Sequence, residues 1–180
     1  MEVEGRWSMA PAFVVGDPIS VLGEVDGKTF LEGLQKRLGA DVRFGASSKA
    51  YASADLPETA WHDLLDRVEV EMGDGLSPRL WALRDYKGAY IPQLSAEAAS
   101  IKIPIGLGSH TLVCLGRDGL KKELIRFAKV LELPTREDDV VAYFNRDVYN
   151  DDEGYDICAY CQLMLALIES ERRDQPIWLL

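Results

Sequence analysis

Two cysteines separated by two residues have a spacing that could support redox chemistry or provide half of a zinc site. Cys158 and Cys161 form this motif. In redox proteins the first cysteine of such a motif lies at the N-terminus of a helix, where the helix dipole stabilises the thiolate. Here the helix is expected to begin at Asp151 or Asp152, and carboxylates near a thiol raise its pKa. The motif is therefore not predicted to be a redox centre.

A zinc ion at this motif would need two further nitrogen or sulfur ligands. The rest of the chain offers Cys114, His62 and His110, which are far apart in the sequence. Free cysteine is also one of the residue types most often found buried. We therefore expect three free thiols, no bound metal and no cofactor.

The loop Gly106–His110 is a second place where side chains could do chemistry. His110 could act as an acid or base there, with Ser109 or Arg117 contacting a ligand, because loops often carry functional residues. The loop does not match a phosphate-binding motif, since Thr111 stands where the third glycine would be. Ser109 also lacks the flanking glycines of a hydrolase nucleophile. A small-ligand-binding protein or a hydrolase-like enzyme using this loop is the alternative interpretation.

An acidic run near the C-terminus could bind calcium or a basic protein. Aligning Gly154 with the glycine of an EF-hand puts Tyr149 and Tyr160 at positions that require Asp and Glu. The calcium loop is therefore excluded. Between residues 135 and 174 there are 11 acidic and 4 basic residues, which gives a net charge of −7. Aromatic residues lie within this stretch, and tyrosines among carboxylates suit a surface that binds a basic partner.

The residues expected to contact such a partner are Asp147, Tyr149, Asp151, Asp152, Glu153 and Tyr155. The opposing interpretation is that Phe144 and Tyr160 belong to the core and that the charges only keep the protein in solution. Residues 102–129 have the opposite balance, with 6 basic and 2 acidic residues, and Lys122, Arg126 and Lys129 would form a smaller positive helix face.

The composition is that of a folded globular protein. The chain has 180 residues, 47% of them hydrophobic and 28% charged, with a net charge of −10. This excludes a disordered or low-complexity chain, and the negative charge argues against binding to nucleic acids and membrane surfaces. One domain over residues 1–180 is expected, with residues 1–11 the least ordered. The free cysteines and the absence of a basic, apolar leader predict a cytoplasmic location.

The elements that must position these residues follow from hydrophobic periodicity. Short strands alternate with helical segments, which predicts an α+β fold, or a small α/β fold, with about five helices on a mixed sheet. Strands are expected at 13–15, 19–22, 90–92, 101–105, 111–115 and 177–180, and helices at 28–38, 57–72, 118–131, 138–144 and from about 152 to 168. Pro92 and Pro104 cannot donate to a ladder, which indicates strand ends or an edge.

Several helix starts and one assembly contact are also predicted. Asp118 is expected to cap the helix that follows Gly116, and Thr135 the next one. Asp55 and Glu58 are spaced as a capping pair before the second helix. The terminal strand Ile177–Leu180, if exposed, could pair with a second copy and form a homodimer.

Taken together, these features predict a non-catalytic protein that binds another protein. The specific version is an immunity or antitoxin-type inhibitor from a bacterium, whose acidic patch covers the basic cleft of a toxin such as a nuclease. The reasons are the small single domain, the strong negative charge and the incomplete catalytic motifs.

Overall fold

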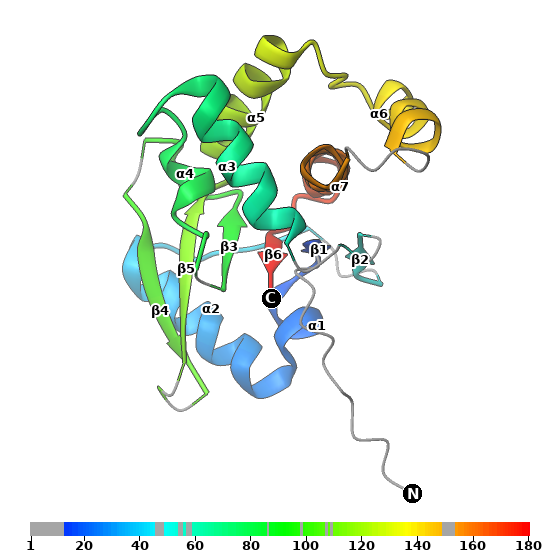
Figure 1. Cartoon of the computed structure of the whole chain (residues 1–180). Helices are drawn as coiled ribbons and strands as arrows, with labels where there is room; N and C mark the ends of the chain where they lie inside the picture. Colours follow the sequence, from blue (N-terminus) through cyan, green and yellow to red (C-terminus); the bar gives the residue numbers. More distant parts are fainter. Residues whose placement is uncertain are drawn as a thin grey trace, which may run out of the picture.

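A mixed six-stranded sheet lies at the centre of the molecule (Figure 1). The computed structural model describes residues 13–45, 49–53, 56, 59–85, 87–97, 99–106, 108, 110–148 and 154–180. The strand order is β2-β1-β6-β3-β5-β4. Among the described strands, β3 and β5 pair in parallel and the other neighbouring strands pair antiparallel. The strands are β1 (Phe13–Val15), β2 (Tyr51–Ala52), β3 (Gly88–Ile91), β4 (Ile101–Ile105), β5 (His110–Gly116) and β6 (Ile177–Leu179).

Seven α-helices in the described residues pack around this sheet, which confirms the predicted α+β class. They are α1 (Pro18–Leu22), α2 (Glu24–Leu38), α3 (Ala60–Met72), α4 (Pro78–Trp81), α5 (Arg117–Leu131), α6 (Glu137–Tyr143) and α7 (Tyr155–Arg173), with a π-helical segment, η1 (Phe144–Val148), after α6. Among these described helices, none combines the length and the apolar character needed to span a membrane.

The alternation of side chains along the strands builds a separate core on each face of the sheet. In β6, Ile177 and Leu179 join the larger core with α3, α5 and α7, whereas Trp178 joins the smaller core beneath α2. In β5, Val113 and Cys114 divide between the two cores in the same way. Successive side chains of a strand point to opposite faces. The result is a three-layer arrangement, with α1 and α2 on one side of the sheet and the other helices on the opposite side (Figure 1).

Helix α7 is buried around most of its circumference. Apolar residues recur at helical spacing along this helix, and three of them, Tyr160, Cys161 and Met164, are buried. Residues on its other side, including Leu163 and Leu167, are buried as well, because α7 packs against α3, α5, α6 and β1. The buried middle of this helix has no acidic residue. Its contribution to the negative charge of residues 135–174 comes from Asp156, Glu169 and Glu171, near its two ends.

The terminal strand lies in the interior of the sheet, so the predicted dimer edge is wrong. β6 pairs antiparallel with both β1 and β3. The Trp178 indole nitrogen donates a hydrogen bond of 2.8 Å to the carbonyl of Gly16. No backbone groups of this strand are left for a second copy. The edge strands are β2 and β4, and the position of Pro104 in β4 confirms the edge predicted for that proline.

The segment predicted as a strand at residues 19–22 is instead the short helix α1. The Asp17 carboxylate caps it by accepting hydrogen bonds from the backbone N–H groups of Ile19 and Ser20, at 3.0 and 3.1 Å. Pro18 occupies the first turn, where its missing N–H costs nothing. Read as a cap followed by proline, the Asp-Pro pair starts a helix, and this signal outweighs the β-branched residues after it.

Three other helix starts differ from the predicted caps. Helix α5 follows an N-cap at Gly116, so Asp118 lies inside its first turn, where its charge favours the helix dipole. Helix α6 has Arg136 at its N-cap in place of Thr135. Helix α7 begins after Gly154. The expected pair Asp55 and Glu58 lies outside the described residues.

Candidate functional site

Two of the predicted partner-binding residues, Asp147 and Tyr155, belong to the described part of the chain. Tyr155 is the first residue of α7, and its side chain is 57% exposed. Asp147 lies in the π-helical segment that packs against α7. Tyr149, Asp151, Asp152 and Glu153 lie outside the described residues. Of the proposed contact surface, the structure therefore describes Tyr155 and the backbone of Asp147.

The first turn of α6 adds carboxylates that the sequence analysis counted but did not single out. Glu137, Asp138 and Asp139 are all exposed and all within this turn. The helix dipole explains their position, because negative side chains stabilise a helix N-terminus. Val141 on the same helix is 41% exposed. Because Glu137 pairs with Arg172, this acidic turn lies at the C-terminal end of α7, about 25 Å along the helix from Tyr155 at its start.

Arginines of α7 neutralise part of the acidic region. Arg172 forms an ion pair of 2.6 Å with Glu137 and a second one with Glu169. Arg173 also pairs with Glu169. Asp139 has only a long contact of 3.9 Å with Arg136. The arginines of α7 thus offset Glu137 and Glu169, whereas Asp138 and Asp139 beside them lie outside these ion pairs.

Most of the aromatic residues near this region belong to the core. Tyr160 is fully buried, and its hydroxyl donates a hydrogen bond of 2.7 Å to the carbonyl of Pro134. Tyr143 and Phe144 are partly buried against the larger core. Of the predicted aromatic contacts that the structure describes, Tyr155 is exposed. The opposing interpretation is therefore correct for Tyr160 and leaves Tyr155 available.

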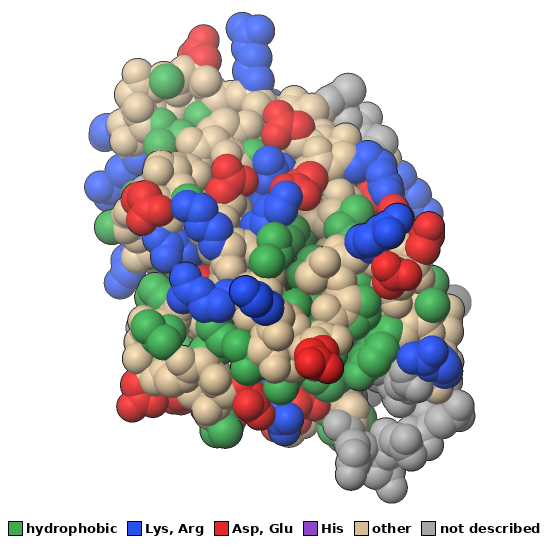
Figure 2. All heavy atoms as spheres, turned by 90° about the horizontal axis from the view of Figure 1, so that it is seen from above, with side chains coloured by type: hydrophobic (Ala, Val, Ile, Leu, Met, Phe, Trp, Pro, Cys, Tyr) green, Lys and Arg blue, Asp and Glu red, His purple; other side chains and the backbone are tan. Residues whose placement is uncertain are grey.

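A basic stripe runs along the outer face of α5. Its side chains line a shallow hollow of about 470 Å³, and they are Lys121, Lys122, Ile125, Arg126 and Lys129. Figure 2 shows Lys and Arg side chains gathered over the centre and left of the face seen from above, with Asp and Glu among them. The positive helix face predicted from the sequence is present in the structure.

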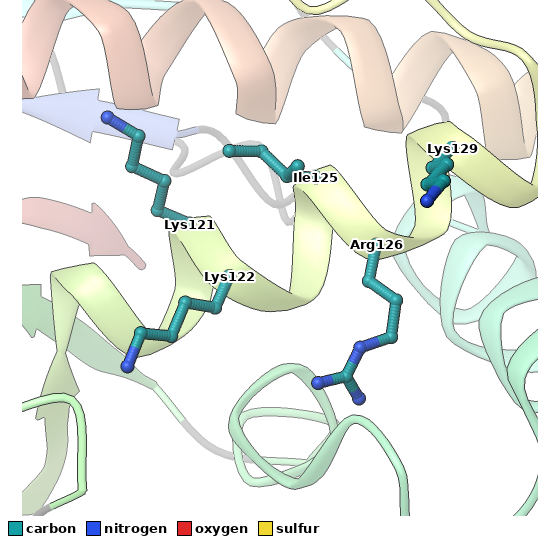
Figure 3. Close-up of a pocket in the computed structure, with 5 residues that line it drawn as sticks. All are labelled: Lys121, Lys122, Ile125, Arg126 and Lys129. Atoms are coloured by element: carbon teal, nitrogen blue, oxygen red, sulfur yellow. The ribbon is translucent and has the colours of Figure 1, made fainter.

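The stripe is only loosely neutralised by its surroundings. Lys121 pairs with Glu171 of α7 at 2.7 Å, and Lys122 pairs with Glu97 at 3.2 Å. Exposed pairs of this kind contribute little. Figure 3 shows Lys121 and Ile125 pointing to the side of α5 where α7 lies, whereas Lys122 and Arg126 point to the opposite side. The charges therefore spread along the helix and do not converge on one point.

The structure does not bring His110 and Arg117 of the alternative ligand site together. His110 is the first residue of β5, exposed at one end of the strand, whereas Arg117 follows its other end. At about 3.3 Å per residue, the strand separates them by roughly 20 Å. Arg117 is largely buried, and it donates a hydrogen bond of 3.0 Å to the carbonyl of Ser170. Ser109 lies outside the described residues.

The three cysteines are free thiols, and burial raises the pKa of each. The pKa of Cys114 and that of Cys161 both rise to about 12. The backbone N–H of Cys158 already donates to the carbonyl of Gly154, so this group is not available to stabilise a thiolate. Within the described part of the chain, no group of three or more His, Cys, Asp or Glu side chains is placed to hold a metal ion.

One buried titratable residue was missed by the sequence analysis. Glu123 of α5 is 3% exposed, and its carboxylate accepts the backbone N–H groups of Arg79 and Leu80 at 3.0 to 3.1 Å. The Arg79 side chain adds an ion pair of 3.3 Å. Burial raises the pKa of Glu123 despite these contacts. Its place between Leu120 and Phe127 on the apolar stripe is the signal that could have identified it. Its role is to cap α4 from α5.

Comparison with known proteins yields no similarity that bears on function: no protein-family model, no curated protein and no solved structure matches this chain.

Proposed function

We propose that this protein is a non-catalytic binding protein whose partner is basic. Two exposed features near opposite ends of α7 support this: Tyr155 at its start and the acidic first turn of α6, which adjoins its C-terminal end. In its specific form, the proposal is an inhibitor of the immunity or antitoxin type, which covers the basic cleft of a toxin. The cytoplasm is its expected location.

The chemistry of this surface suits such a partner. Asp138 and Asp139 are exposed, and the ion pair found for them among the described residues is a long contact of 3.9 Å between Asp139 and Arg136. Carboxylates attract a basic protein and increase its association rate. A tyrosine supplies a large contact area and a hydroxyl at a low entropic cost, and tyrosines are enriched among the residues that dominate binding energy.

The alternative, a ligand site built from the Gly106–His110 loop, has less support. Its two described polar side chains lie at opposite ends of β5, and Arg117 already serves to hold the C-terminal end of α7. A partner-binding surface needs no such convergence, because it is spread over several exposed side chains.

The test compares partner capture by two matched variants. The first carries Asp138→Lys, Asp139→Lys and Tyr155→Ala. The control carries Glu24→Lys and Glu32→Lys on the exposed face of α2, on the other side of the sheet. Affinity purification from the native cell identifies the partner, and calorimetry with the purified pair measures the Kd.

We expect a basic partner whose Kd rises by at least about tenfold in the first variant and by less than about twofold in the control. A charge reversal of Asp151 and Asp152 is expected to act in the same direction. An acidic partner, or a Kd that the first variant leaves unchanged, would contradict the proposal. Relief of toxicity on co-expression tests the inhibitor form separately.

A further inference from the structure

The basic stripe on α5 is unusual for an exposed helix face because its charges repel one another. Lys122 and Arg126 are spaced i,i+4, and Arg126 and Lys129 are spaced i,i+3. Like charges at these spacings destabilise a helix. Within α5, the one acidic residue between Lys122 and Lys129 is Glu123, which is buried and does not alternate with them on the surface. A local cost of this kind is expected where a surface has a function.

The same face exposes apolar side chains. Ile125 is 45% exposed in the middle of the stripe, and Val130 at its end is 49% exposed. The lysine and arginine stems beside Ile125 add methylene groups to the shallow hollow. The face therefore exposes Ile125 on the side toward α7, with cationic side chains beside it along the helix (Figure 3).

We propose that this stripe binds an acidic segment of a partner protein. An apolar side chain of the segment would lie on Ile125, and its carboxylates would pair with Lys129 and, on the side facing away from α7, with Lys122 and Arg126 (Figure 3). Arg126 holds its place by a hydrogen bond of 3.3 Å to the carbonyl of Leu76, which leaves further guanidinium donors for a carboxylate. Partly desolvated pairs of this kind fix the register of a bound segment.

Two features favour an acidic segment over a nucleic acid. The stripe contains no aromatic side chain on which a base could stack. Glu97 and Glu171 also pair with Lys122 and Lys121, which shortens the cationic stretch below the continuous one that a phosphate backbone follows. A single small anion is also disfavoured, since the cationic groups in Figure 3 point to different sides of the helix.

This inference is independent of the proposed function, because it concerns another helix and the opposite charge. The test begins with a displayed library of random peptides of about 15 residues, long enough to follow the face of α5, selected on the wild-type protein. Peptides recovered from it are synthesised with a fluorescent label, and their Kd is measured by anisotropy at about 0.15 M salt.

Two triple variants separate the stripe from general charge effects. Lys122→Gln, Arg126→Gln and Lys129→Gln remove the stripe, whereas Lys28→Gln, Lys36→Gln and Arg37→Gln remove the same charge from exposed positions of α2. Ile125→Ser tests the apolar centre. Thermal unfolding of each variant confirms that it is folded.

We expect the selected peptides to be acidic with a central apolar residue. Their Kd should rise by at least about tenfold in the stripe variant, by about threefold or more in Ile125→Ser, and by less than about twofold in the α2 variant. Recovery of no peptides, or of peptides that are not acidic, overturns the inference. So does an oligothymidylate that binds more tightly than the peptides and loses affinity in the stripe variant but not in Ile125→Ser.

Discussion

At the scale of single residues, burial decides what the reactive side chains can do. Cys114 and Cys161 are fully buried, and their thiols have pKa values of about 12. A thiolate is the nucleophilic form, and near neutral pH these two groups are almost entirely protonated. In this protein the two cysteines of the Cys-x-x-Cys motif pack in or against the hydrophobic core.

The thiols should consequently be unreactive in the native protein. With a thiol-specific colorimetric reagent at about pH 8, we expect Cys114 and Cys161 to react only when denaturant unfolds the chain. Cys158 is half-buried with a raised pKa and should react slowly. Rapid reaction of all three thiols without denaturant would contradict this burial. A variant with Cys158→Ser identifies the slow site.

The same pKa values give the direction of the pH dependence. The pKa of Cys114 rises from an ordinary value near 9 to about 12 in the folded state, so between these values the native state retains a proton that the unfolded state has lost. The contribution of such a thiol to the free energy of unfolding is fully present below pH 9 and decreases as the pH rises toward 12.

Residue types alone could not separate reactive from buried side chains. Tyr155 and Tyr160 are both tyrosines in the same acidic stretch, yet one is exposed and the other is in the core. Tyr160 lies on the predicted apolar stripe of α7, and this periodicity was the better guide. Glu123 is the opposite case: its residue type suggests exposure, but its position among the apolar residues of α5 indicates that it is buried with hydrogen-bond partners.

At the scale of elements, close backbone packing joins α1 to α2. A Cβ atom at Gly27 would lie 2.6 Å from the Ile19 Cα and 2.7 Å from the carbonyl oxygen of Pro18. Both are backbone positions that cannot move without shifting α1. Gly33 on the same helix differs, because a Cβ there would lie 2.8 Å from a methyl group of Ile103, which can rotate.

Two alanine substitutions on α2 should therefore have different effects. Gly27→Ala is expected to lower the free energy of unfolding by about 1–3 kcal/mol, because overpacking outweighs the better helix propensity of alanine. Gly33→Ala should cost less, since its neighbour is a side chain. Urea denaturation followed by circular dichroism measures both values. Equal values for the two variants would show that the close approach of α1 does not matter.

Periodicity predicted the middle of the elements better than their ends. The stripes of α3, α5 and α7 and the strands β4 and β5 are present where apolar spacing places them. Helix starts depend on a few backbone groups, and Asp17 shows how one cap can turn a strand-like segment into a helix. Asp118 and Thr135 show the opposite error, since both are good capping residues near starts that form at other positions.

At the scale of the whole molecule, the order of the strands decides which residues can form a site. β5 runs the full distance between His110 and Arg117, so residues close in sequence end up far apart. The candidate acidic surface depends in turn on how α6 packs on α7. Local periodicity contains no information on either arrangement. The class of fold and the charged helix faces could thus be predicted, but their relative positions could not.

The position of β6 makes the C-terminus essential for the fold. Its removal would deprive both β1 and β3 of their shared ladder and expose the two cores that meet at the sheet. One side chain of this strand, that of Trp178, already contributes strongly. It is fully buried, and its ring packs edge-on against Phe30 with the centroids 5.0 Å apart. Loss of a buried tryptophan side chain costs about 3–5 kcal/mol, which approaches the total stability of many domains, about 5–15 kcal/mol.

Deletion of Ile177–Leu180 should therefore abolish cooperative unfolding. Trp178→Ala should lower the midpoint of thermal unfolding strongly. Leu180→Ala should have a small effect, because Leu180 lies after the strand and is partly exposed. Circular dichroism melts and light scattering on the same samples provide the measurements. If the strand were an exposed edge that joins two copies, the truncated chain would remain folded and become monomeric. That result would contradict the central position of β6, because an interior strand cannot be removed without loss of the sheet.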